Sequence, residues 1–237
     1  MKLSMKEIEH DLATWWEQPW CMDRWEIINH LIKRYKFESY LEIGVSNPRW
    51  CFNMVSCRDK DGVDPGYEFD NNVANYNMTS DEFFDTIPKD KKWDVIFIDG
   101  LHLAQQVIKD VYNALDHLNE GGFILMHDCN PPNVWRQREN YSIDGYNYPW
   151  NGTTWKAYYQ LRKTRSDLSM CVIDTDYGVG LIRRGRQILA PADNEFYDFN
   201  ILQEKKKEYL NLISCDELDS FLDTTDENLN ENLTPTL

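Results

Sequence analysis

The stretch WDVIFIDGLHLAQQVIKDVYNALDHLNEGGFILMHD, residues 93–128, decides the fold. It starts with a nearly continuous apolar run, residues 93–99, which is typical of a parallel strand buried on both faces. Apolar residues at helical spacing follow at 103–118, and a second apolar run follows at 123–128. A strand, a helix and a strand in this order predict a βαβ crossover, which requires a parallel sheet. We therefore expect an α/β protein with an open, largely parallel sheet.

The flanking segments extend this alternation. Residues 39–45 and 61–65 are expected to be strands, and a weak third strand is expected around 73–78. Residues 48–57 predict a helix with a proline in its first turn, where a missing N–H costs nothing. Farther on, MCVIDTDYGVGLIRR, residues 170–184, predicts two strands joined by a tight turn, and hence an antiparallel pair at the sheet edge.

The chain divides into three parts. Residues 1–36 are expected to form a helical cap, residues 37–200 the ligand-binding α/β domain, and residues 201–237 a helix with a frayed acidic tail. Within the central part, residues 129–152 form a long loop rich in aromatic residues. A loop of this length is usually functional, which favours a substrate lid with aromatic walls.

Composition restricts the classes of partner. With 237 residues, 42% of them hydrophobic, the chain suits one α/β domain with a sizeable core. A formal net charge of −15 disfavours nucleic acid and anionic membranes, because phosphates would be repelled. The six cysteines are scattered without CxxC pairs, so we expect reduced thiols. No apolar run suits a signal peptide or a membrane span, which predicts a cytoplasmic protein and leaves homo-oligomerisation open.

Polar side chains gather where the predicted parallel strands end. Ligands of open parallel sheets bind beyond the carboxyl ends of the strands, so we expect these side chains to share one site. Such groups are costly at the edge of an apolar sheet unless they serve a ligand. The residues concerned are Glu42, Gly44, Asp64, Asp99, His102, His127, Asp128 and Asn130.

Asp64 lies 22 residues after Glu42, at the end of the second predicted strand. A carboxylate at this position can accept hydrogen bonds from both hydroxyls of a ribose. The alternative is an acid that caps a helix or closes a turn. The neighbouring Gly62 and Pro65 favour the ligand role.

The turn after the first strand, GVSNPRW at residues 44–50, differs from a dinucleotide fingerprint. Pyrophosphate binding needs a glycine-rich turn and a free helix N-terminus. This turn instead has bulky side chains at Val45, Arg49 and Trp50. A ligand with ribose and adenine but no phosphate would be accommodated, and S-adenosylmethionine (SAM) is such a ligand.

A set of motifs occurs in a characteristic order, namely YLEIGV (40–45), GVDP (62–65), TSDEFF (79–84), WDVIFIDGLH (93–102), LNEGGFILMHDCNPP (118–132), WNGTTWKAYYQLR (150–162) and DTDYGVG (174–180). Over about residues 25–185 the chain thereby resembles class I SAM-dependent methyltransferases of the small-molecule and sugar O-methyltransferase type. The resemblance implies a Rossmann-like, three-layer αβα fold with a seven-stranded, mostly parallel sheet whose last strand is antiparallel. Further glycines of the class are replaced here by Ser46 and Pro48.

The resemblance also implies where the cofactor lies. Glu42 and Gly44 would face the methionine part of SAM, and Asp64 would face its ribose. Ser80 or Asp81 would face its adenine. The remaining residues of the expected cofactor-binding set are Val45, Pro65, Asp99 and Gly100.

Methyl transfer to a hydroxyl needs a positioned nucleophile and a proton acceptor. Asp99 ends the predicted fourth strand, and His102 follows in the next helical turn. An imidazole of near-neutral pKa is expected to act as the base there. His127 and Asp128, at the end of the fifth strand, complete the expected catalytic set.

Some methyltransferases of this type also hold a divalent cation at these strand ends. Asp99, Asp128 and Asn130 could supply an oxygen-ligand set of the kind that Mg²⁺ prefers. The metal would lower the pKa of a bound hydroxyl. Without it, His102 and His127 with Asp128 could abstract the proton.

The leading hypothesis is therefore an O-methyltransferase that acts on a hydroxyl of a small molecule, most plausibly a sugar or glycan precursor. A Rossmann-type enzyme that uses NAD or a nucleotide sugar is the second hypothesis, and the missing glycines count against it. The third is a methyltransferase fold used as a non-catalytic binding module.

Overall fold

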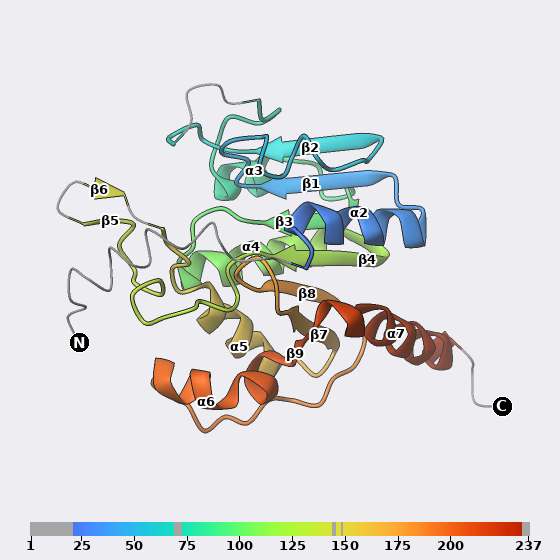
Figure 1. The fold of residues 1–237 in the computed structure, drawn as a ribbon. Coiled ribbons are helices and arrows are strands. Elements are labelled where there is room, and N and C mark those ends of the chain that lie inside the picture. Colours follow the sequence, from blue (N-terminus) through green and yellow to red (C-terminus); the bar gives the residue numbers. More distant parts are fainter. Residues whose placement is uncertain (1–20, 69–72, 144–145, 148, 234–237) are drawn as a thin grey trace.

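The computed structural model describes residues 21–68, 73–143, 146–147 and 149–233, and its centre is a seven-stranded sheet (Figure 1). The strand order is β2-β1-β3-β4-β8-β7-β9. The strands are β1 Ser39–Ile43, β2 Asp59–Val63, β3 Trp93–Ile98, β4 Leu118–Met126, β7 Leu168–Ile173, β8 Val179–Arg184 and β9 Leu212–Ile213. A separate hairpin pairs β5 Ser142–Ile143 with β6 Tyr146–Asn147.

Helices cover both faces of this sheet, which gives the three layers that were expected. The helices are α2 Arg24–Tyr35, α3 Ser80–Thr86, α4 Ala104–Asp116, α5 Thr154–Thr164, α6 Phe199–Leu210 and α7 Leu218–Leu233, with the short 3-10 helix η1 Cys215–Glu217. Helices α2 and α7 pack on one face, and α3, α4, α5 and α6 pack on the other (Figure 1). Along β4, Ile124 and Met126 point to one core and Phe123 and Leu125 to the other, because strand side chains alternate. The strand is buried on both faces, as its apolar run predicted.

The crossover β3–α4–β4 and the antiparallel strand are confirmed. β3 pairs in parallel with β4, and β8 is antiparallel to both β4 and β7. β8 lies inside the sheet, so the expected edge position of the antiparallel pair is wrong, and β9 covers the edge beyond β7. The weak third strand expected around 73–78 is a single parallel bridge between Val63 and Tyr76.

The helix expected at 48–57 is wrong. Residues 48–54 form successive turns, in which Trp50 N–H donates to the Asn47 carbonyl at 3.0 Å and Asn53 N–H donates to the Pro48 carbonyl at 2.8 Å. The apolar side chains of Cys51 and Phe52 pack against the sheet from this irregular segment. Consequently no helix begins at the turn that follows β1.

A helix was expected at the start of residues 201–237, where α6 lies; the acidic segment after it, expected as a frayed tail, contains α7 up to Leu233. Leu218 and Leu222 are buried against the face that α2 covers. Two acids of α7 pair with Arg34 of α2, which contacts Asp219 at 3.0 Å and Asp223 at 2.5 Å. Residues 234–237, like residues 1–20 of the expected cap, lie outside the described part of the chain.

The expectation of six reduced thiols is wrong for one pair. Cys21, in front of α2, and Cys215, in η1, form a disulfide that joins residues 194 positions apart. The other four cysteines are free thiols. In the described part of the chain, none of the helices has the length and apolarity that a membrane crossing requires.

Candidate functional site

A cavity of about 660 Å³ opens at the carboxyl ends of β1, β3 and β4. It collects side chains from the strand ends, from the start of α2 and from the 129–152 loop. Most of the predicted site residues therefore line one space. The predicted residues that line it are Glu42, Gly44, Val45, Asp99, Gly100, His102, His127 and Asp128.

Gly44 allows the ends of β1 and β3 to meet. Its φ is +89°, a conformation that side chains disfavour, and a Cβ at this position would lie 2.3 Å from the Asp99 carbonyl oxygen. The Gly44 N–H donates to the Val63 carbonyl at 2.8 Å, and the Asp99 N–H donates to the Ile43 carbonyl at 2.8 Å. The single glycine therefore holds the cavity wall together where three strands end.

Glu42 is a buried acid with an unpredicted partner. The Tyr40 hydroxyl donates to its carboxylate at 2.5 Å. Burial raises the pKa of Glu42 to about 8, although the hydrogen bond from Tyr40 opposes the shift. Glu42 therefore carries a proton at neutral pH in the unliganded cavity. The only signal in the sequence for this contact is that Tyr40 and Glu42 are two positions apart, because residues at this spacing lie on the same face of a strand.

Asp64 joins the two loops that follow β1 and β2. Its carboxylate accepts hydrogen bonds from Ser46 N–H at 2.7 Å and from Gly66 N–H at 2.6 Å. The second bond is that of a turn-closing acid, which was the alternative to the ribose role. Neither Asp64 nor Pro65 lines the cavity, and the ribose role stays a prediction.

Ser80 and Asp81, at the start of α3, contact α4 instead of the cavity. Gln106 donates to Ser80 at 3.2 Å and to Asp81 at 2.9 Å, and Lys109 pairs with Asp81 at 2.6 Å. Neither residue is among those that line the cavity. Their expected contact with adenine stays a prediction.

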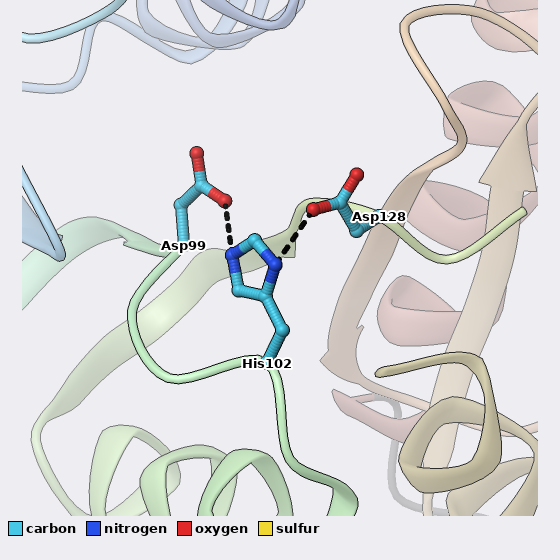
Figure 2. Close-up of side chains that lie close together, drawn as sticks. All are labelled: Asp99, His102 and Asp128. Atoms are coloured by element: carbon cyan, nitrogen blue, oxygen red, sulfur yellow. Dashed lines mark ion pairs between the residues drawn. The ribbon is translucent and has the colours of Figure 1, made fainter. Parts of the chain in front are cut away.

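The ring of His102 lies between the carboxylates of Asp99 and Asp128 (Figure 2). Its Nε2 is 3.2 Å from Asp99 Oδ1, and its Nδ1 is 2.9 Å from Asp128 Oδ2. Burial lowers the pKa of His102, but the nearby Asp128 and Asp99 outweigh burial and raise it to about 10. The near-neutral pKa expected for a base is therefore wrong, and His102 is protonated at neutral pH.

A second set of charges lies behind this cluster. His127 contacts Asp99 through Nδ1 and Asp176 through Nε2, both at 3.2 Å. Arg24, at the start of α2, pairs with Asp99 at 2.8 Å and with Asp176 at 2.7 Å. The two imidazolium groups and Arg24 overcome the effect of burial and hold the pKa of Asp99 well below its usual range.

The sequence interpretation missed Asp176 and Arg24. Asp176 follows β7, which runs in the direction of β4, so its carboxylate reaches the same edge of the sheet. The rule that located the other strand-end acids would have found it. For Arg24 the sequence carries no such signal, since it reaches the site from a helix 75 residues before Asp99.

The 129–152 loop closes the cluster from the solvent side. Trp150 stacks on His102 with ring centroids 5.0 Å apart and an angle of 20° between the planes. The next residue, Asn151, donates to Asp128 at 2.5 Å. Tyr141 and Trp150 both line the cavity, as expected for aromatic walls. Among the other aromatic residues of this loop, Trp135 does not line the cavity, and the side chains of Tyr146 and Tyr148 lie outside the described part of the structure.

The Mg²⁺ set expected from Asp99, Asp128 and Asn130 is not assembled. The Asn130 amide donates to Asp174 at 2.9 Å, and Asn130 does not line the cavity. His102 stands near the two acids instead, and Asp99, His102 and Asp128 offer one ligand atom each within 4.8 Å of one another. One imidazole and two carboxylates are not the all-oxygen set that Mg²⁺ prefers.

A family model described as "Methyltransferase domain" matches residues 36–129. This span contains the glycine turn, the crossover β3–α4–β4 and the four residues of the expected catalytic set. This match agrees with the resemblance to class I SAM-dependent methyltransferases, and it covers residues 36–129 of the chain. No curated protein matches the chain.

The chain is also similar to solved structures, three of which contain SAM or S-adenosylhomocysteine (SAH). An O-methyltransferase from Streptomyces achromogenes in complex with SAM is 13% identical. The match covers 78% of this chain and 91% of that protein, with a TM-score of 0.48. An O-methyltransferase from Bacillus cereus in complex with SAH is 17% identical. The match covers 77% of this chain and 90% of that protein, with a TM-score of 0.43. An SAH-bound methyltransferase of Podospora anserina is 15% identical. The match covers 77% of this chain and 88% of that protein, with a TM-score of 0.46. Similarity this distant does not transfer a function to the chain.

Proposed function

We propose that the protein transfers the methyl group of SAM to a hydroxyl of a small molecule, with a sugar or glycan precursor as the acceptor. One observation carries the proposal. A single cavity joins the glycine turn after β1 to a cluster of carboxylates and imidazoles that can handle a proton. A methyltransferase needs these two parts within reach of each other.

The cofactor side of the cavity suits a ligand without phosphates. Glu42, Gly44, Val45 and Gly100 would hold the methionine part of SAM, and Asp64 would hold the ribose after the nearby loops adjust. Residues 48–54 form turns, so the segment that follows the glycine turn after β1 offers no helix N-terminus to bind a pyrophosphate. This disfavours the NAD hypothesis. SAM itself supplies the activated methyl group.

The protein's own task is to orient the acceptor hydroxyl and remove its proton. An alcohol oxygen becomes far more acidic as it bonds to the methyl carbon, so a carboxylate is a sufficient acceptor for the proton. Asp99 is the accessible carboxylate, with 15% of its side chain exposed against 5% for Asp128. Asp99 thus receives the proton, while Asp128 holds His102 and His102 holds Asp99.

The mouth of the cavity supports a sugar-like acceptor. Trp50, 64% exposed, and the loop residues Tyr141 and Trp150 line it with flat apolar surfaces. Such rings pack against the C–H faces of a sugar, and the carboxylates of Asp23 and Glu68 can accept hydrogen bonds from its hydroxyls. The expected partner of the protein is therefore a small-molecule acceptor. The cytoplasmic location of the protein stays a prediction.

Incubation with methyl-labelled SAM and a panel of glycosides, sugar nucleotides and phenols tests the proposal. We expect label in one or more glycosides, in amounts that depend on enzyme concentration. Label in phenols alone would contradict the sugar acceptor. The absence of transfer to any hydroxyl, together with no binding of SAH, would contradict the activity.

A further inference from the structure

An imidazole fills the space between the two strand-end carboxylates. β3 and β4 are parallel neighbours, so Asp99 and Asp128 reach the same edge of the sheet. The His102 ring lies between them and contacts one acid with each of its two nitrogens (Figure 2). A divalent cation shared by these acids would need the same space and the same oxygen lone pairs.

The charges around this ring are already balanced. The cluster contains three carboxylates and three basic side chains that are positively charged when protonated. The carboxylates are those of Asp99, Asp128 and Asp176, and the basic side chains are those of Arg24, His102 and His127. Each acid contacts at least one base, and the second oxygen of Asp128 accepts a hydrogen bond from Asn151. A buried charge without a partner is costly, so a divalent cation added to this set would be repelled by three cations.

We infer that His102 occupies the place of a divalent cation, so that the site holds its two carboxylates without a metal. As an extension of the proposed function, this makes the methyl transfer metal-independent. His102 acts as a positioning residue, since it contacts both carboxylates and so fixes the spacing of Asp99 and Asp128 at the cavity wall. Trp150 stabilises the ring in that place by stacking on it.

The alternative is a metal bound by one nitrogen of His102 together with both carboxylates. One ligand atom from each of Asp99, His102 and Asp128 lies within 4.8 Å of the other two, so a metal could bind there if the ring turned. Removal of the imidazole distinguishes the two arrangements. If His102 excludes the cation, then His102→Ala leaves two carboxylates facing an open space and creates a binding site. If His102 is a ligand, the same change weakens a site that the wild type already has.

Electron paramagnetic resonance titration with Mn²⁺ measures this directly. We expect the wild type to bind no more Mn²⁺ than the double variant His102→Ala/Asp128→Asn, which reports the background from the acidic surface. We expect His102→Ala to bind one Mn²⁺ about tenfold or more tightly than that background. Tight Mn²⁺ binding by the wild type, or no gain in His102→Ala, would overturn the inference.

Two further measurements keep the result decisive. If His102→Ala does not fold, as judged by thermal unfolding, the wild-type titration is repeated with Mg²⁺ and Zn²⁺, and binding of either ion at the site would overturn the inference. Calorimetry with SAH separates the two proposals. Wild type that binds SAH and also a metal contradicts only the inference, whereas wild type that binds no SAH contradicts the proposed function.

Discussion

The two sides of the cavity are built in different ways. On the cofactor side, at the ends of β1 and β2, the contacts join residues close in sequence, such as Tyr40 with Glu42 and Ser46 with Asp64. On the catalytic side, at the ends of β3 and β4, Asp176 contacts His127 across 49 residues and Arg24 across 152. The first side depends mostly on β1, β2 and the turns that follow them, with Gly100 at the end of β3 beside Gly44. The second requires the whole sheet and α2 to be in place.

This difference has a chemical counterpart. On the cofactor side, burial raises the pKa of the Glu42 carboxyl to about 8, so this acid is neutral at neutral pH. The catalytic side carries three ionised acids matched by three bases. Substitutions on the cofactor side should therefore change binding, and substitutions on the catalytic side should change turnover and the pH dependence of stability.

The largest effect is expected from Asp99→Asn, which keeps the size of the side chain and removes the proton acceptor. Methyl transfer should fall about 10²–10⁴-fold, the usual contribution of a positioned acid or base. SAH should still bind. Steady-state kinetics with labelled SAM measures the loss, and Asp116→Asn, on the exposed end of α4, is the matched control. Activity near that of the control would show that Asp99 does not receive the proton.

The next largest effect is expected on the free energy of unfolding, which should fall as the pH rises. The pKa of His102 is raised from 6.5 to about 10, so its contribution is complete below pH 6.5 and is lost as pH rises through about 10. The free energy of unfolding should fall by up to about 1.4 kcal/mol per pH unit in this window on account of this group. At the acid end, the pKa of Asp128 is lowered from 3.8 to about 2, so its contribution is lost only as pH falls through about 2.

Urea unfolding at pH 6.5, 7.5 and 8.5 measures this slope, and His102→Gln removes the group. We expect the curve of the variant to be flatter than that of the wild type over this range. Gln105→Ala, which changes an exposed uncharged residue of α4, should keep the slope of the wild type. Identical slopes in the wild type and His102→Gln would contradict the raised pKa.

On the cofactor side, Asp64→Ala should weaken SAH binding about 10–150-fold. The carboxylate accepts the Ser46 and Gly66 N–H groups, and a hydrogen bond to a charged group contributes about 1.5–3 kcal/mol. Its loss should loosen both loops that would surround the ribose. Calorimetric titration measures the affinity, with Asp59→Ala, which changes an exposed acid at the start of the strand preceding Asp64, as control. An unchanged affinity would remove Asp64 from the cofactor site.

The smallest effect is expected from Trp150→Ala, which removes the ring stacked on His102. A stacked aromatic pair contributes about 0.5–1.5 kcal/mol, so turnover should fall about threefold to tenfold. Trp150→Phe keeps a ring and should recover most of the loss. If both variants reduce turnover equally, the indole contributes through its hydrogen bond to Arg138 and not through stacking.

The amount that the sequence predicts differs between the two sides. The apolar runs of β3 and β4 are enough to place Asp99, His102, His127 and Asp128 at one edge of the sheet, because parallel strands bring their carboxyl ends together. Periodicity could not show that the His102 ring would stand between two acids. That arrangement depends on Trp150 and Asn151, which approach from a loop without a repeating pattern.

The failures have physical reasons as well. The helix expected at 48–57 was overridden by packing, because Cys51 and Phe52 reach the sheet from a series of turns. The acidic C-terminal segment has the composition of a frayed tail, yet its acids pair with Arg34 and Arg183, which composition cannot reveal. In both cases the deciding partner is distant in sequence.

Calorimetric titration of the wild-type protein with SAH, alongside NADH, tests the central claim most directly, because it asks whether the cavity recognises an adenosyl group without phosphates. The account predicts saturable binding of one SAH per chain and no binding of NADH. Binding of NADH without SAH, or of neither compound, would contradict it.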